Sequence, residues 1–110
     1  MIVVKEFCDD ATVLAPRPGV DSSTAKQFEE TLLAAIERGS GKVVIDFSDL
    51  DYISSAGLRT IIIGAKAAKS KGGKLILCSM RNHIRTVFDT SGFSKLVPIV
   101  AHREDASFAA

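Results

Sequence analysis

The stretch VVIDFSDLDYISSAGLRTII, Val43–Ile62, decides which fold class the chain can adopt. It begins with a continuous apolar run, Val43–Ile45, as expected of a central strand that helices cover. After two serines and a glycine, apolar residues recur at helical spacing, namely Leu58, Ile61, Ile62 and Ala65. The stretch therefore predicts a buried strand followed directly by a helix from about Ala56 to Ser70.

The segments before this stretch predict a hairpin and a first helix. Ile2–Phe7 and Ala11–Ala15 are short β-prone runs, and Cys8–Asp10 between them suits a hairpin turn. Residues 21–24 are all candidate N-caps, and Gln27 can form a capping box with Thr24. Apolar residues at helical spacing then continue towards Gly39, namely Ala25, Phe28, Leu32, Ala35 and Ile36.

The segments after it predict further alternation of strands and helices. Lys74–Cys78 has the composition of a buried strand. A short helix is expected next, with inward-facing Ile84, Val87 and Phe88 and with Gly92 at its end. Leu96–Val100 predicts a last strand, confined to a sheet edge by Pro98. Residues 102–109 predict a final short helix that is held mainly by Phe108.

This order of elements predicts an α/β fold. A hairpin followed by alternating helices and strands implies a mixed sheet with parallel βαβ crossovers, with about four to five strands and four helices. The 110 residues suffice for one core but not for two, so we expect a single domain over residues 1–110.

Composition narrows the class of partner. Lys and Arg number 14 against 13 Asp and Glu, which gives a net charge of +1 and no reason to expect nucleic acid or a membrane as a direct partner. The N-terminus lacks a signal-peptide core, and no apolar run approaches a membrane span, so a cytoplasmic protein is expected. Cys8 and Cys78 have no metal-type spacing and are expected to be reduced thiols, with a disulfide as the alternative.

Motifs of enzymes are missing from the sequence. The two histidines, His83 and His102, are far apart in sequence and near no obvious nucleophile. The SSAG motif is not a nucleophile elbow, because Ile53 stands where the first glycine should be. Three aspartates, Asp46, Asp49 and Asp51, fit a polar strand exit better than a cation site. We therefore expect no catalytic activity, no cofactor and no metal.

The two serines at the strand-to-helix junction allow two interpretations. Either Ser54 or Ser55 can be the N-cap of the helix, which satisfies an orphan backbone N–H and is worth about 1 kcal/mol. Alternatively, a hydroxyl at this position is exposed at the carboxyl end of a strand, where a phosphate would meet free N–H groups and the helix dipole. Spacing alone favours the cap but leaves both interpretations open.

Most of the chain also resembles a known family. The central stretch is similar to the signature of STAS domains, and specifically of bacterial anti-sigma factor antagonists, with an apolar strand, an Asp-Leu pair and a Ser-x-Gly-Leu block. GVDSSTAKQFE (Gly19–Glu29) resembles the family's helix entry, and GGKLILCSMRNHIRTVFDTSGFSKLVPI (Gly72–Ile99) resembles its later strand, helix and closing segment. Many members have Asp before the acceptor serine, where this chain has Ser54.

The resemblance implies a phosphorylation switch. In that family the unphosphorylated antagonist binds an anti-sigma factor, which is also a serine kinase of the histidine-kinase ATPase fold, and a metal-dependent serine phosphatase restores the binding form. Carried over by position, Ser55 is the phosphoacceptor, with Ser54 as second choice, because only Ser55 keeps the Ser-x-Gly-Leu spacing. Gly57 then lets the helix start approach closely, and Asp21 and Asp46 line the same corner.

Helical geometry predicts a partner-binding surface beside these serines. If Leu58 and Ile62 face the sheet, then Arg59, Ile63 and Lys66 turn outward. Together with Ser54 and Ala56 they form the predicted partner-binding surface. Ile63 is the apolar member among cations, and packing against a neighbouring helix is an equal alternative for it.

Three other functions compete with the antagonist role. A response-regulator receiver would use Asp9, Asp10 and Asp46 as an acidic cluster, but the second segment is β-prone rather than helical and no Lys-Pro pair follows the last strand. Two other STAS roles are a scaffold in a large signalling assembly and the small cytoplasmic subunit of a lipid transporter. The intact acceptor motif in an isolated domain favours the antagonist.

Overall fold

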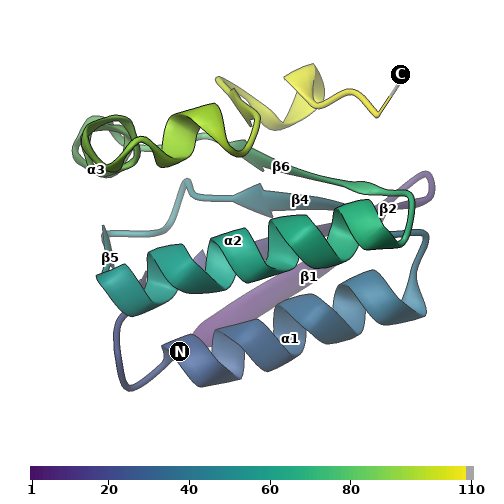
Figure 1. Ribbon diagram of the computed structural model, residues 1–110, viewed down its shortest axis with the longest axis horizontal. Coiled ribbons are helices and arrows are strands. Elements are labelled where there is room, and N and C mark those ends of the chain that lie inside the picture. The colour runs from purple at the N-terminus through teal and green to yellow at the C-terminus, as the bar shows by residue number, and fades with distance from the viewer. Residues whose placement is uncertain (109–110) are drawn as a thin grey trace.

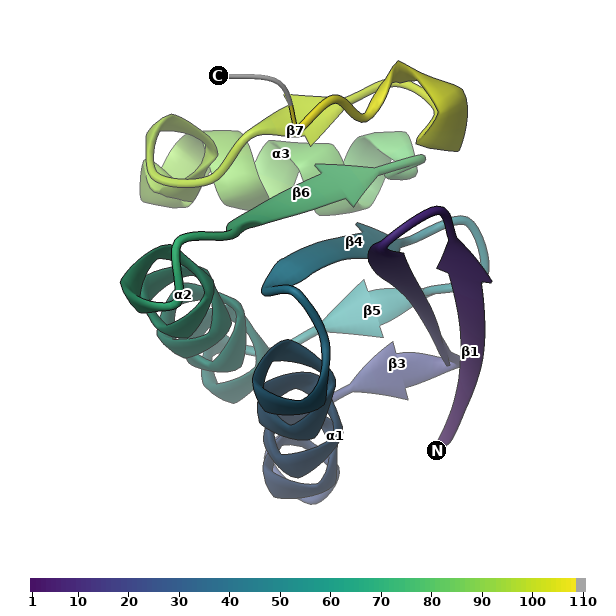
Figure 2. The same cartoon turned by 90° about the vertical axis from the view of Figure 1, so that its right-hand side faces the viewer.

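The main sheet has five strands in the order β1-β2-β4-β6-β7 (Figures 1 and 2). The structure is a computed structural model that describes residues 1–108. The first two strands pair antiparallel as a hairpin, and each later pairing is parallel. This is the predicted mixed α/β sheet. Its strands are β1 (Ile2–Cys8), β2 (Ala11–Arg17), β4 (Lys42–Asp46), β6 (Lys74–Cys78) and β7 (Ile99–Val100).

Three α-helices connect the parallel strands of residues 1–108: α1 (Ala25–Arg38), α2 (Ser55–Ser70) and α3 (Asn82–Ser91). The hairpin also differs from the fold of a response-regulator receiver, in which a helix follows the first strand. The predicted fourth helix over residues 102–109 is wrong. Within the described residues this segment forms only a 3-10 turn, Arg103–Asp105, because so short a segment gains few helical hydrogen bonds for the cost of nucleation. Residue 109 lies outside the described residues.

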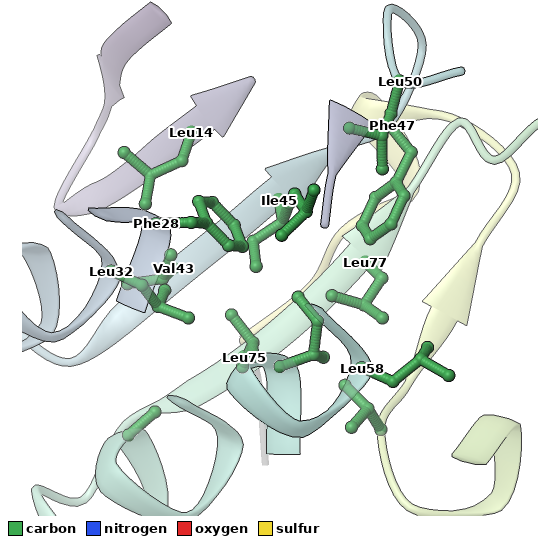
Figure 3. Close-up of a cluster of buried hydrophobic side chains, with 14 of the residues drawn as sticks. Leu14, Phe28, Leu32, Val43, Ile45, Phe47, Leu50, Leu58, Leu75 and Leu77 are labelled. Carbon is green, nitrogen blue, oxygen red and sulfur yellow. The ribbon is translucent and has the colours of Figure 1, made fainter. Parts of the chain in front are cut away.

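The main core lies between one face of the sheet and the helices (Figure 3). Leu14, Val43 and Ile45 on the strands are buried against Phe28 and Leu32 of α1. Leu58 and Ile61 of α2 complete this layer as predicted, and the rings of Phe47 and Phe88 meet edge to face at 5.8 Å. Alternation along the strands therefore places every second residue in this core.

Helices α1 and α2 lie side by side over this face (Figures 1 and 2). Their close approach depends on Gly64, since a Cβ at this position would come within 2.3 Å of Cδ2 of Leu32. A glycine in the middle of a helix costs about 1 kcal/mol relative to alanine, so its presence here has a packing reason.

A smaller cluster occupies the opposite face of the sheet. Val13, Val44 and Cys78 are buried there, and Val100, Ala106 and Phe108 pack over them. Phe108 packs over this cluster, as predicted, but it shares this role with Ala106 and with the ion pairs of Arg103. Cys8 and Cys78 are both free, and β2 and β4 lie between their strands. At about 4.8 Å per strand they are too far apart for a disulfide, so that alternative is excluded.

Two details differ from the sequence prediction. Val87 on α3 is 36% exposed rather than inward-facing, because the buried stripe of this helix consists of Ile84 and Phe88 alone. The last strand is shorter than Leu96–Val100. Leu96 follows a 3-10 turn, Phe93–Lys95, and is 62% exposed, and only Ile99 and Val100 pair with β6.

Candidate functional site

The junction between β5 (Tyr52–Ile53) and α2 gives its two serines different environments. Ser54 has extended backbone angles, φ −91° and ψ 175°, and its Oγ accepts a hydrogen bond from the N–H of Gly57 at 3.3 Å. Its carbonyl accepts from the N–H of Leu58 at 2.9 Å, which starts the helix. Ser54 is thus the N-cap, while Ser55 is the first helical residue and its side chain is exposed.

A two-stranded parallel sheet fixes this junction. Its strands, β3 (Gly19–Val20) and β5, are too short to be recognised from the sequence. Val20 pairs with Ile53, and the N–H of Ser54 donates to the carbonyl of Val20 at 2.8 Å. A Cβ at Gly57 would lie 2.6 Å from Cγ1 of Ile53 and 2.9 Å from Cγ1 of Val20, so only glycine allows α2 to start this close.

Asp21 lies at this corner, as the resemblance implies. Its Oδ1 accepts hydrogen bonds from the hydroxyl of Ser23 at 2.6 Å, from the N–H of Ser23 at 2.9 Å and from the N–H of Thr24 at 3.1 Å. These bonds, led by the one from the Ser23 side chain, lower the pKa of Asp21. The hydroxyl of Tyr52 donates to Oδ2 of Asp21 at 3.4 Å, which ties the loop to β5.

The predicted capping box between Thr24 and Gln27 does not form. The Oγ1 of Thr24 accepts from the N–H of Asp21 at 3.0 Å, and the Thr24 side chain makes no cap hydrogen bond to α1. The reason is local: the Thr24 hydroxyl is engaged in the preceding turn, where it also donates to Oδ1 of Asp21 at 3.3 Å, and does not bind the first turn of α1. Asp21 therefore orders the entry to α1 beside the serines.

Asp46 does not lie at this corner, which corrects the prediction from the resemblance. Its neighbour Ile45 points into the core under the helices, so alternation along β4 turns Asp46 to the opposite face. There its Oδ2 accepts from Nη2 of Arg103 at 2.8 Å and from Nε at 3.2 Å, and its Oδ1 accepts from the N–H of Ser48 at 2.9 Å. Burial by itself would raise the pKa of Asp46, but the bonds from Ser48 and Arg103 outweigh it and lower the pKa.

The predicted partner-binding residues other than the N-cap Ser54 lie along one strip of α2. The side chains of Arg59 and Lys66 are exposed, and Ala56 and Ile63 are half-buried. Among the described side chains that pack against the main core, Ala56 is included and Ile63 is not. Ile63 lies on this strip between Arg59 and Lys66, and its part in partner binding stays a prediction.

A hollow of about 280 Å³ borders this strip between the first turns of α1 and α2. Lys26 and Glu29 line it from α1, and Ala56 and Arg59 line it from α2. The serine junction thus adjoins a polar recess that carries two cations and one anion.

The aspartates that could have suggested a cation site are separated. Asp46 pairs with Arg103, Asp51 with Arg81, and Asp49 lies 4.0 Å from Arg17. Across residues 1–108, no group of three or more metal-binding side chains is close enough to hold an ion. No helix in this part of the chain has the length and apolar character to cross a membrane.

Comparison with known proteins assigns the fold. The family model of the STAS domain matches residues 3–106, which is nearly the whole described chain. The chain belongs to the STAS domain family. This STAS domain is 42% identical over 101 residues to the Bordetella bronchiseptica protein BtrV, named as an anti-sigma factor antagonist, and the match covers 91% of this chain and 87% of BtrV.

Solved structures share the fold of this STAS domain at low sequence identity. An anti-sigma factor antagonist of Thermotoga maritima, tm1081, superimposes with a TM-score of 0.88 at 22% identity and covers 94% of this chain and 89% of its own. The Bacillus cell fate determinant SpoIIAA in its phosphorylated form has a TM-score of 0.72 at 18% identity and covers 94% and 96%. The family to which the sequence resemblance pointed is therefore correct.

Proposed function

We propose that this STAS domain is an anti-sigma factor antagonist that phosphorylation of Ser55 switches off. In the unphosphorylated state it binds an anti-sigma factor that is also a serine kinase of the histidine-kinase ATPase fold, and so regulates sigma-dependent transcription. A metal-dependent serine phosphatase restores the binding form. The relationship to BtrV supports the antagonist role, and the exposed hydroxyl of Ser55 at the start of α2 is the observation that carries the switch.

Ser55 is a better acceptor than Ser54 because of what each hydroxyl does. The Oγ of Ser54 already accepts the N–H of Gly57, and the residue is half-buried. A phosphate on Ser54 would have to replace this cap within a junction that is also held by Val20. A phosphate on Ser55 would project from an exposed position and would leave the cap in place.

Electrostatics can provide the switch without a change of fold. Phosphorylation adds a charge of about −1.5 to −2 at neutral pH to the surface formed by Ser55 and the α2 strip. A hundredfold loss of affinity requires about 2.7 kcal/mol, which a doubly charged group without a matching cation on the partner can cost. We expect the backbones of the two forms to superimpose closely. SpoIIAA in its phosphorylated form has the same fold, so phosphorylation of SpoIIAA is compatible with this fold.

The test is reconstitution with the natural partner. A tagged Ser55→Ala variant, which cannot be phosphorylated at residue 55, should capture the kinase from cells of the source organism. The purified kinase should then transfer phosphate from ATP to the parent and to Ser54→Ala but not to Ser55→Ala. Calorimetry should show at least about hundredfold weaker binding of the phosphorylated form, corresponding to about 2.7 kcal/mol.

Other outcomes of the same experiment would reject the proposal. Capture of a transport ATPase would indicate the small subunit of a lipid transporter, and recovery in a very large complex without a kinase would indicate a scaffold. Equal affinity of the two forms for a captured kinase would remove the phosphorylation switch.

A further inference from the structure

Arg59 lies one helical turn after Ser55 on the same face of α2. Residues four apart on an α-helix have their Cβ atoms about 5–6 Å apart, and helical side chains lean towards the N-terminus. The side chain of an arginine at residue 59 is therefore long enough to reach back along α2 to residue 55, which we propose as acceptor. Both residues are exposed, so no packed side chain separates them from solvent.

Within residues 1–108, the guanidinium of Arg59 has no hydrogen-bond or ion-pair partner. Among residues 1–108, four other arginines form ion pairs with a carboxylate: Arg17, Arg81, Arg85 and Arg103. Glu29 is the carboxylate that shares the hollow with Arg59, but the two are not within 4.0 Å, and Lys26 is the other cation there. A free guanidinium is thus held beside the serine without an anion in the described chain.

The backbone supplies further donors to the same place. The Ser54 hydroxyl caps the N–H of Gly57, but within the described residues the N–H groups of Ser55 and Ala56 have no acceptor. Such groups, at the positive end of the helix dipole, stabilise an anion. Guanidinium binds phosphate with two parallel N–H···O bonds, which are stronger than bonds between neutral groups.

We propose that Arg59 binds the phosphate of phosphorylated Ser55 within the same molecule, an inference that rests on the proposed function. Phosphorylation then changes the partner-facing surface twice: it adds the phosphate and withdraws the cation of Arg59. Arg59 is available to an acidic group of the partner only while Ser55 is unmodified. The partner-facing surfaces of the phosphorylated and unphosphorylated forms therefore differ by more than the charge of the phosphate alone.

The test measures the phosphate directly and needs no partner. The full chain is produced with phosphoserine inserted at residue 55 during translation, and the second pKa of the phosphate is followed by ³¹P NMR at about 0.1 M salt. An adjacent cation favours the dianion, so this pKa, ordinarily about 6, should be lower in the parent than in Arg59→Gln by about 0.2–0.4.

Lys66→Gln is the matched control. It removes one exposed cation from the same strip of α2, but residue 66 is about 16 Å from residue 55 along the helix axis, beyond the Debye length of about 10 Å at 0.1 M salt. Lys66→Gln should therefore leave the phosphate pKa at the parent value, and Arg59→Lys, which keeps the charge, should stay close to it. An Arg59→Gln titration equal to the parent, or a Lys66→Gln shift as large as that of Arg59→Gln, would overturn the proposal.

This result is independent of the switch itself. Because the phosphoserine is inserted synthetically, the titration can show the Arg59 contact even if no kinase modifies Ser55 in cells. Conversely, Ser55 can be the natural acceptor while Arg59 leaves the phosphate untouched, in which case the proposed function stands and this inference fails.

Discussion

Ser54 and Ser55 are adjacent in the chain, but only Ser54 uses its hydroxyl inside the fold. The Oγ of Ser54 accepts the N–H of Gly57 at 3.3 Å, whereas Ser55 is exposed at the first position of α2. The pair therefore combines a helix cap with a candidate modification site. One serine holds the helix start in place, and the next is left available at its surface.

The two serines should differ in their contributions to stability. Ser54→Ala removes the acceptor for the N–H of Gly57 and should lower the free energy of unfolding by about 1 kcal/mol. Ser55→Ala leaves this cap intact and should change stability by less than about 0.5 kcal/mol. Urea unfolding of both variants measures the difference. A larger loss for Ser55→Ala than for Ser54→Ala would show that Ser54 is not the cap.

Ile63 should matter for partner binding rather than for folding. Ile63→Asp places a charge at a half-buried position outside the main core, so unfolding should stay cooperative. The unphosphorylated variant should bind its partner at least about tenfold more weakly than the parent, which corresponds to 1.4 kcal/mol. Ser70→Asp, two turns further along the same exposed strip, is the matched control. Unchanged affinity of Ile63→Asp by calorimetry would remove this residue from the interface.

The C-terminal segment should protect the thiol of Cys78. Cys78 is fully buried beneath Ala106 and Phe108, and Arg103 anchors this segment through ion pairs with Asp46 and Glu6. Burial raises the pKa of the Cys78 thiol, which further slows its reaction. In Arg103→Gln the segment should open more often, and labelling of Cys78 by a thiol reagent should accelerate at least about tenfold, or 1.4 kcal/mol in the opening equilibrium.

The exposed Cys8 provides an internal reference in this experiment, because it should react at once in every variant. The control is Arg85→Gln, which breaks the ion pair with Asp89 on α3 and should leave the rate at Cys78 unchanged. If Arg103→Gln and the parent label at the same rate, the ion pairs of Arg103 do not hold the segment.

Asp46 should make stability depend on pH in the acid range. Its pKa in the folded protein lies below the ordinary value of 3.8, so the folded state binds this proton less readily than the unfolded state. The stabilisation is therefore present above the ordinary pKa and is lost as the pH falls through the lower, folded pKa. The difference in unfolding free energy between the parent and Asp46→Asn should shrink as the pH falls below about 4. A difference that stays constant from neutral pH to pH 3 would contradict this role.

Sequence patterns predicted the elements whose apolar spacing was long and regular. The strand at Val43–Ile45 and the helix near Ala56–Ser70 appear as β4 and α2 with only small shifts in their ends. The two-residue strands β3 and β5 were missed because pairing of that length leaves no periodicity in the sequence. Their hydrogen bonds are what bring Val20 and Asp21 to the serines.

The site predictions failed where they depended on which face a strand residue takes. Asp46 was assigned to the serine corner by position in the motif alone, and its alternation with Ile45 places it on the opposite face with Arg103. The pairing between Arg103 and Asp46 joins residues 57 positions apart, and no local pattern indicates it. The close approach at Gly57 was implied by the family resemblance, and the exposure of Arg59 and Lys66 follows from helical spacing.

The most direct test of the switch is intact and fragment mass spectrometry of the protein isolated from its own cells, both growing and stressed. We expect a single phosphate on Ser55 whose occupancy changes between the two conditions, with Ser54 unmodified. Phosphate on Ser54 instead would contradict the division of roles between the two serines. The absence of phosphate from both serines in every condition would contradict the switch, and the domain would then be a constitutive binding module.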